Sequence, residues 1–329
     1  MKLEWIEFLR GFSILTIVFA HLIQGYIGKV PGIIMKASTF GGTGVHVFFF
    51  CSGIGLYLSH LRHPLSGIEF LKRKVWRIYI PYILVVIVST TVPSLYQYDD
   101  KGIALLSHIF LFKMFVPKYE CSFGGQFWYI STLFQFYLLF NLIVKFKERV
   151  KKKFFWYVLF CSIFWWVLMV FTNLGEERVW GSFFLQYIWE FAAGMCIAEK
   201  IHNGEDICVD VRILVPTAVL GVILAAWASQ INVFFRVAND IVAFAGYISV
   251  ALLLYSVGWS VVNRSIIFIS RYSYEWYLTH ILVFHIVVQL WKPVGSPSPV
   301  SGIVAVVVSF IVAIMYNILW KKVHMYRGI

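Results

Sequence analysis

Stretches of about twenty apolar residues recur along the whole chain, and they constrain its fold more than any other feature of the sequence. A helix rises about 1.5 Å per residue, so about twenty residues cross the roughly 30 Å hydrocarbon core of a bilayer. Hydrophobic residues make up 60% of the 329 residues and charged residues only 13%, against roughly 25% charged in soluble domains. Because a bilayer offers no partner for backbone polar groups, we expect an all-α, polytopic transmembrane bundle that forms one integral membrane domain over residues 1–329.

The apolar runs predict ten spanning helices and one short segment that does not span. The short run, Ile103–Val116, has only 14 residues and contains Lys113, which fits a re-entrant or interfacial segment better than a spanning helix. The predicted spans are Trp5–Ile27, Thr43–Leu61, Val75–Tyr96, Gln126–Phe146, Phe154–Thr172, Trp180–Ile201, Ile213–Ile231, Ala238–Trp259, Tyr272–Trp291 and Val300–Lys321.

The distribution of basic residues indicates how these spans are oriented. With ten spans, both termini lie on one side, and the loops on that side hold most of the 28 Lys and Arg residues, including the cluster at 145–153. Loops rich in Lys and Arg face the cytoplasm, so we expect both termini in the cytoplasm. The same distribution explains the net charge of +12 without nucleic acid as a partner. Five cysteines with no CxxC pair indicate neither a disulfide framework nor a zinc site.

The first predicted span carries three ionisable residues on one helical face. Arg10 and His21 are 11 residues apart, which is about three helical turns, and Glu7 lies three residues before Arg10, where its carboxylate can pair with the guanidinium. An Arg in hydrocarbon costs about 3 kcal/mol on insertion scales, so this face cannot meet lipid and must line a polar interior. The alternative is that these side chains only join helices through hydrogen bonds and have no chemical role.

The spacing of Arg10 and His21 resembles the R-x10-H signature of the acyltransferase-3 family, whose members are integral membrane acyltransferases that modify glycans. Glu7 stands where that family commonly has Asp. The segment GGTGVHVFFFCSGIGLYLS (Gly41–Ser59) resembles the second helix of the family, with His46 at a position where Asp is common.

Three further segments resemble the family in the same order along the chain. FLKRKVWRIYIPY (Phe70–Tyr82) resembles its basic entry into the third helix. QFWYISTLFQFYLLF (Gln126–Phe140) is similar to another family segment, although Leu133 and Phe134 stand where many members have acidic residues. SYEWYLTH (Ser273–His280) is similar to a segment of the last helices. Together the five segments extend over nearly the whole chain.

The resemblance implies an acyl-CoA donor, generally acetyl-CoA, that binds from the cytoplasm. Lys74 and Arg77 stand at the basic pair of the family, and Arg73 lies four residues before Arg77 on the same helical face. We expect these three side chains to bind the donor phosphates, since guanidinium groups match phosphate oxygens. Without the resemblance, basic residues at a cytoplasmic helix end are most often topology signals or contacts to lipid headgroups.

Acyl transfer from a thioester to a hydroxyl needs a base with a pKa near neutral, and the imidazole of His21 suits that role. Glu7 and Arg10 lie about three to four turns from His21, too far to orient its ring directly. We expect them to shape the donor channel or to bind the CoA end of the donor.

Four residues are candidates for the acceptor side of the site. Trp128 and Tyr129 lie at the outer start of their predicted helix, where aromatic residues also form ordinary interfacial belts. His46 and His280 lie in predicted helices, where a histidine also commonly joins neighbouring helices by a hydrogen bond. No histidine spacing in the sequence predicts a metal site.

We therefore expect a membrane-embedded acyltransferase that moves an acyl group, most simply acetyl, from acyl-CoA to a hydroxyl of a cell-surface glycan or lipid-linked sugar. A transporter or flippase of an anionic or sugar substrate would also line its path with Arg, Glu and His. No inverted repeat is visible in the sequence, which counts against that alternative. A third interpretation is a non-catalytic membrane subunit of a polysaccharide assembly system.

Overall fold

The computed structural model describes residues 3–27, 30–207, 209–228, 231–291 and 298–326. Within these ranges every regular element is a helix and no strand occurs, so the all-α prediction is confirmed. The longer helices are α1 (Glu4–Gly25), α2 (Gly32–Gly41), α3 (Gly44–Arg62), α4 (Gly67–Lys74), α5 (Ile80–Ser89), α6 (Lys101–Ile109), α7 (Trp128–Val150), α8 (Phe154–Phe171), α10 (Phe184–His202), α11 (Val211–Ala228), α13 (Asp240–Val257), α14 (Ser260–Ser270), α15 (Ser273–Trp291) and α16 (Pro299–Tyr326). The shorter α9 (Arg178–Gly181) and α12 (Val233–Ala238) precede α10 and α13.

Among the described residues, six helical stretches are long and apolar enough to cross a membrane, so the predicted number of ten spans is not confirmed. They are Glu4–Gly25, Gly32–Arg62, Gly125–Phe171, Val211–Ala228, Val233–Val257 and Pro299–Val323. The third stretch contains two helices, α7 and α8, which meet at the basic turn Lys151–Lys153. The predicted spans Trp180–Ile201 and Tyr272–Trp291 correspond to α10 and α15, whose polar side chains lower their mean hydropathy.

The predicted span Val75–Tyr96 differs most from the observed helix. The helix begins earlier, with α4, because Ser66 and Glu69 form a capping box that satisfies the first backbone amides. It then passes through a π-helical turn, Val75–Tyr79, and ends with α5. The basic residues of α4 and the π-helical turn therefore belong to one continuous helix.

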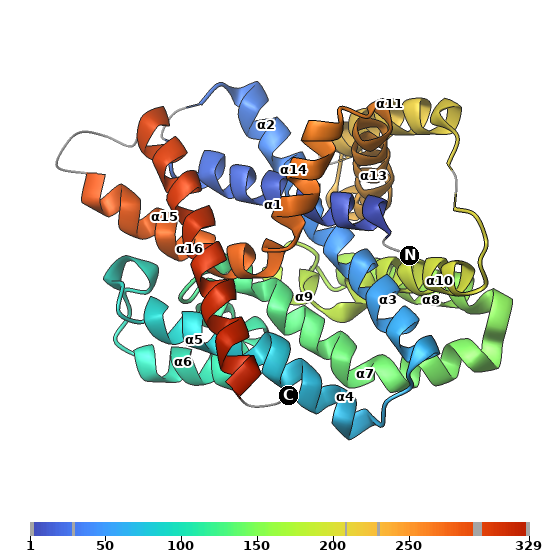
Figure 1. Ribbon diagram of the computed structural model, residues 1–329, viewed down its shortest axis with the longest axis horizontal. Coiled ribbons are helices and arrows are strands. Elements are labelled where there is room, and N and C mark those ends of the chain that lie inside the picture. The colour runs from blue at the N-terminus through green and yellow to red at the C-terminus, as the bar shows by residue number, and fades with distance from the viewer. Residues whose placement is uncertain (1–2, 28–29, 208, 229–230, 292–297, 327–329) are drawn as a thin grey trace.

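Helix α1 lies in the middle of the bundle, where it packs against α2, α3, α13, α14, α15 and α16 (Figure 1). Gly11 lets α14 come close, because a Cβ at this position would lie 2.0 Å from the backbone oxygen of Ile266. Helices α3 and α10 approach equally closely at Gly53 and Gly194, where a Cβ would lie 2.1 Å from a backbone oxygen of the other helix. These contacts fix the positions of the polar side chains on α1, α3 and α10.

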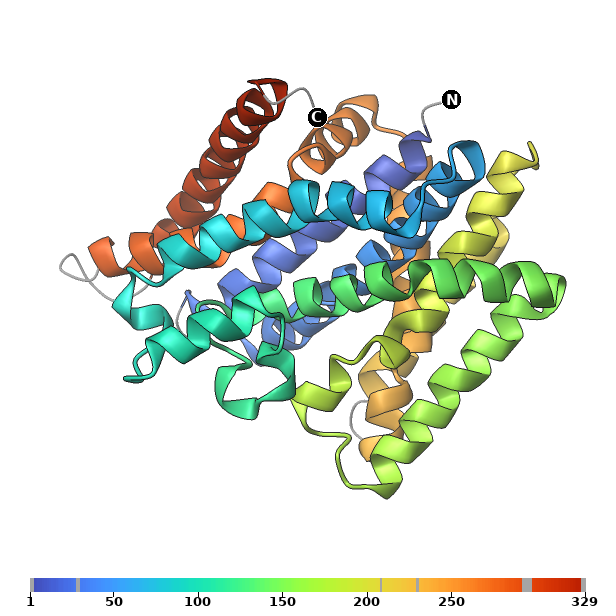
Figure 2. The same cartoon turned by 90° about the horizontal axis from the view of Figure 1, so that it is seen from below.

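The bundle has two distinct ends, which are seen in Figure 2. The start of α1, the turn between α3 and α4 and the turn between α7 and α8 lie toward the right of that view, and the segment between α5 and α7 lies toward the left. The run Ile103–Val116 belongs to this left-hand segment. It does not form one helix, because α6 ends at Ile109 and a 3-10 turn, Lys113–Phe115, follows.

Candidate active site

Helices α1 and α15 bring together two histidines that lie 259 residues apart in the chain. Nδ1 of His21 lies 2.8 Å from Nε2 of His280, and the two imidazole rings are stacked with their centroids 5.1 Å apart. His280 is fully buried, whereas His21 is partly exposed. The inner histidine, His280, therefore contacts the outer one and has no exposed surface of its own.

The hydrogen bonds of His280 determine which nitrogen of His21 is free. Nδ1 of His280 lies 2.9 Å from the carbonyl oxygen of Trp276, and a carbonyl can only accept, so this nitrogen carries the hydrogen. In the neutral ring Nε2 of His280 then accepts, and Nδ1 of His21 must donate to it. Nε2 of His21 is left with a lone pair and has no hydrogen-bond partner among the described residues, so it is the basic atom of the pair.

His21 lies on the wall of a cavity of about 540 Å³, a volume in the range of roughly 300–1,000 Å³ that is typical of small-molecule sites. The cavity lies between the ends of α1 and α15 and the segment that precedes α7. Its other polar or aromatic lining residues include Tyr26, Glu120, Gln126, Trp128, Arg178 and His285.

The cavity wall combines a flat aromatic surface with several hydrogen-bonding groups. The guanidinium of Arg178 lies 4.7 Å from the ring centroid of Trp128, and Nδ1 of His285 lies 3.1 Å from Oγ of Ser94. The hydroxyl of Tyr277 donates to the backbone oxygen of Gln126 and so joins α15 to this wall. Such a wall suits a polyhydroxyl ligand, which has both apolar ring faces and hydroxyl groups.

Buried polar groups hold the segment before α7 in place. Nζ of Lys113 donates to the backbone oxygen of Glu120 at 2.7 Å, and burial lowers the pKa of Lys113 to about 7. His108 is also buried and contacts the hydroxyl of Tyr82 at 2.6 Å and Oγ of Ser122 at 2.9 Å. These bonds fix the backbone that forms one side of the cavity.

At the other end of α1, Glu7 and Arg10 form the predicted ion pair, with 3.3 Å between Nη1 and Oε1. Oγ of Ser270 donates to Oε2 of Glu7 at 2.7 Å, and Nη2 of Arg10 donates to Oγ of Ser273 at 3.4 Å. The pair thus ties α1 to the end of α14 and the start of α15. As predicted from their spacing, neither side chain touches His21.

The helix that carries the basic residues of α4 and the π-helical turn contacts the start of α15. Arg73 and Arg77 are exposed, and Lys74 is half-buried with its ammonium 5.5 Å from the ring centroid of Tyr137. The hydroxyl of Tyr274, the residue after Ser273, donates to the backbone oxygen of Ile78 at 2.5 Å. At the start of α15, Ser273 therefore contacts Arg10, and Tyr274 contacts the backbone of the π-helical turn.

A family model described as an acyltransferase domain matches residues 3–318, which is nearly the whole chain. The chain belongs to the acyltransferase-3 family. Neither the curated proteins nor the solved structures give a match. Membership of this family, together with the six apolar helical stretches, indicates an integral membrane acyltransferase.

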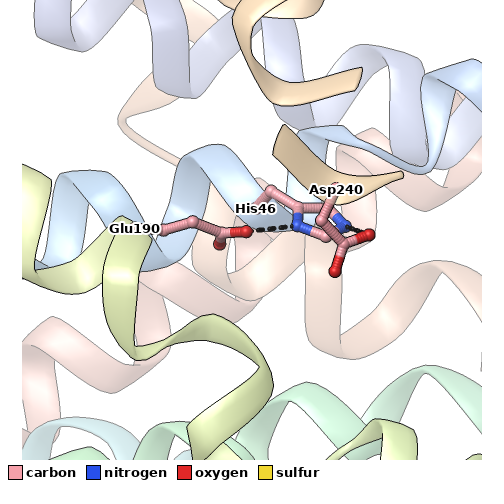
Figure 3. A group of neighbouring side chains, drawn as sticks. All are labelled: His46, Glu190 and Asp240. Atoms are coloured by element: carbon pink, nitrogen blue, oxygen red, sulfur yellow. Dashed lines mark hydrogen bonds and ion pairs between the residues drawn. The ribbon is translucent and has the colours of Figure 1, made fainter. Parts of the chain in front are cut away.

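In this acyltransferase, the residues expected on the acceptor side take different positions. Trp128 lines the cavity, and His280 lies directly behind His21. Tyr129 is buried against Phe49, with 4.8 Å between ring centroids, and is not among the described lining residues. His46 lies between two carboxylates on other helices and is also not among the lining residues (Figure 3).

Several cavity residues were not predicted from the sequence. Arg178 lies in a short helix after two glutamates, where its only signal is a single basic residue in an otherwise acidic loop. His285 lies five residues after His280, a spacing that indicated no shared role. Glu120 belongs to a segment without helical periodicity, and Gln126 was predicted only as the first residue of a span, so the fold alone brings both to the cavity.

Proposed function

We propose that the chain is a single membrane-embedded acyltransferase domain that transfers an acyl group, most simply acetyl, from acyl-CoA to a hydroxyl of a cell-surface glycan or lipid-linked sugar. The observation that carries this proposal is the unpaired Nε2 of His21 on the cavity wall, with its ring oriented by His280. Membership of the family supports the type of reaction.

In the proposed reaction the acceptor hydroxyl donates a hydrogen bond to Nε2 of His21. As the hydroxyl oxygen attacks the carbonyl carbon of the thioester, its proton passes to Nε2. The positive charge that develops on His21 is stabilised by the hydrogen bond from Nδ1 to His280. Collapse of the tetrahedral intermediate breaks the carbon–sulfur bond, and the leaving thiolate of CoA takes the proton from Nε2. The products are the acyl ester of the acceptor and free CoA.

The donor is proposed to bind from the cytoplasm. Arg73, Lys74 and Arg77 bind the phosphates of CoA, and the ion pair of Glu7 and Arg10 shapes the channel that leads the thioester toward His21. The contacts of Ser273 with Arg10 and of Tyr274 with the π-helical turn support this arrangement, because α15 leads from there to His280.

The acceptor is proposed to enter from the opposite side of the membrane. Trp128 packs against the apolar face of a sugar ring, and Arg178 donates hydrogen bonds to sugar hydroxyls or to a phosphate of a lipid-linked acceptor. Tyr129 and His46 are not among the described lining residues of the cavity, so we propose no contact of either with the acceptor.

We also propose ten membrane spans, formed by α1, α3, the π-helical turn with α5, α7, α8, α10, α11, α13, α15 and α16. An even number of spans puts both termini on the same side, which we propose is the cytoplasmic side of the inner membrane. The arrangement in Figure 2 supports this topology, because the basic turn Lys151–Lys153 after α7 lies at the same end of the bundle as the start of α1 and the turn between α3 and α4.

The proposal is tested with radiolabelled acetyl-CoA and membranes that contain the wild-type protein, His21→Ala or the control His63→Ala at matched expression. His63 is exposed at the end of α3, far along that helix from the cavity. We expect label in extracted glycan or lipid from wild type and the control, and a loss of about 100-fold or more in His21→Ala. Incorporation that does not depend on His21 would contradict the proposed base. A transporter would give no incorporation in any sample and would move its substrate without CoA.

A further inference from the structure

Three helices each contribute one titratable side chain to a cluster outside the proposed active site: His46 from α3, Glu190 from α10 and Asp240 from α13 (Figure 3). Nδ1 of His46 lies 2.6 Å from Oε1 of Glu190, and Nε2 lies 3.7 Å from Oδ1 of Asp240. One donor atom from each of the three residues lies within 4.8 Å of the other two. This convergence has no role in the proposed acyl transfer.

Two oxygen atoms at the cluster lack partners. Glu190 is fully buried, and its Oε2 accepts no hydrogen bond from the described residues. Gln186 is also buried and donates from Nε2 to Oδ2 of Asp240 at 2.7 Å, while its own Oε1 has no partner among the described residues. Buried oxygens without a partner are rare in folded proteins, because they lose the hydration that the unfolded chain provides.

The charge of the cluster indicates a cation as the missing partner. Two carboxylates face one imidazole, so with both carboxylates ionised a protonated His46 still leaves one excess negative charge inside the bundle. A divalent cation with a neutral imidazole and two carboxylates leaves no net charge. The ion would also supply a partner for the free oxygens of Glu190 and Gln186.

We propose that His46, Glu190 and Asp240 bind one divalent transition-metal ion, and that Zn²⁺ fits this donor set best. Zn²⁺ binds imidazole nitrogen and carboxylate oxygen at about 2.0–2.2 Å, so a tetrahedral ion holds its ligand atoms about 3.4 Å apart. The three donor atoms lie within 4.8 Å of one another. Nδ1 of His46 faces Glu190 and Nε2 faces Asp240, so the imidazole would turn when the ion binds, to bring one nitrogen and both carboxylates around it. Ca²⁺ and Mg²⁺ prefer sites made entirely of oxygen ligands, so the imidazole favours a transition metal.

The ion would be structural. The three ligands come from three helices and do not line the cavity of His21, so the ion clamps α3, α10 and α13 to one another. Two of these helices, α3 and α10, are the pair that Gly53 and Gly194 bring into close contact. The inference is therefore independent of the proposed acyl transfer, and it can be tested without any substrate.

The test uses the full-length protein, purified without a histidine tag, stripped with a chelator and dialysed against Zn²⁺. We expect one equivalent of Zn²⁺ per chain in the wild type, and at least a tenfold weaker affinity in His46→Ala and in Glu190→Gln. Two matched controls, His63→Ala and Glu205→Gln, change exposed residues of the same types and should bind as the wild type does. Zn²⁺ should raise the Tm of the wild type and the controls by several degrees, and leave the Tm of the two site variants unchanged.

Less than a tenth of an equivalent of Zn²⁺ in the wild type, or equal affinity in His46→Ala and His63→Ala, would overturn the proposal. If a site variant does not fold, Asp240→Asn provides a second test, because it keeps the shape of the side chain and removes its charge. Co²⁺ titration of the wild type provides a measurement that needs no variant. A tetrahedral visible spectrum that Zn²⁺ abolishes supports the site, and an octahedral spectrum of weakly bound Co²⁺ contradicts it.

Discussion

The substitution His280→Ala tests the histidine pair most directly, because His280 is proposed to act only through His21. The substitution removes the acceptor that lies 2.8 Å from Nδ1 of His21. A hydrogen bond to a group that becomes charged contributes about 2 kcal/mol, which corresponds to about 30-fold in kcat. We expect this loss in kcat with little change in the KM for acyl-CoA, measured from initial rates of label transfer at saturating acceptor.

Two comparisons separate a positioning role from a general loss of structure. His280→Gln places an amide oxygen near the position of Nε2, so it should recover part of the activity that His280→Ala loses. The double variant His21→Ala/His280→Ala should be no slower than His21→Ala alone, since no base remains for His280 to orient. If the losses in kcat of the two single variants multiply in the double variant, or if His280→Ala mainly raises the KM, the reasoning from the hydrogen bonds is wrong.

Three other predictions concern the donor site, the helix packing and the loop beside the cavity. Arg73→Gln and Arg77→Gln should each raise the KM for acyl-CoA about tenfold, as expected for one lost charged hydrogen bond, and an equal fall in kcat would argue against phosphate binding. Gly194→Ala puts a Cβ 2.1 Å from a backbone oxygen of α3 and should lower the Tm by several degrees, whereas Gly55→Ala, with no atom within 4 Å of its Cβ, should not. The pKa of Lys113 is about 7 in the folded protein and 10.5 when unperturbed, so the folded state binds fewer protons between these values and the free energy of unfolding should rise with pH across this range. Lys113→Met should remove this rise in the free energy of unfolding, as measured by urea titrations at several pH values. An equally steep rise in the variant would mean that another group causes the pH dependence.

Features that depend on residues close together in one helix could be predicted from the sequence. The ion pair of Glu7 and Arg10 follows from a spacing of three residues, and the structure contains it. The same spacing argument correctly separated this pair from His21. Apolar runs likewise predicted most helices, but their ends and the number of spans depend on capping and on polar side chains inside the bundle. Ser66 and Glu69, for example, start a helix before the apolar run begins.

Contacts between distant segments could not be predicted in this way. The sequence predicted His21 as a base and His280 as a separate residue of the acceptor side, and only the packing of α1 against α15 makes them a pair with one free nitrogen. His46 was expected at the acceptor site because of its place in a motif. The fold instead turns it toward carboxylates on α10 and α13, whose positions no local pattern in the sequence encodes.

The segment around Leu133 also limits which mechanism this chain can use. Many relatives were expected to carry acidic residues here, but Leu133 is buried and Phe134 packs edge-on against Tyr79, with 5.6 Å between ring centroids. Neither position therefore supplies a carboxylate that could orient His21 or take up its proton. The carbonyl oxygen of Trp276 instead accepts from Nδ1 of His280 and so fixes the tautomer of both rings. A carbonyl carries no full charge, so it stabilises the imidazolium of His21 less than a carboxylate would. The variant His280→Glu, which places a carboxylate next to His21, should therefore stabilise the protonated form of the base. We expect the pH at which transfer becomes half-maximal to shift upward in this variant. A purely structural His280 would not produce this shift.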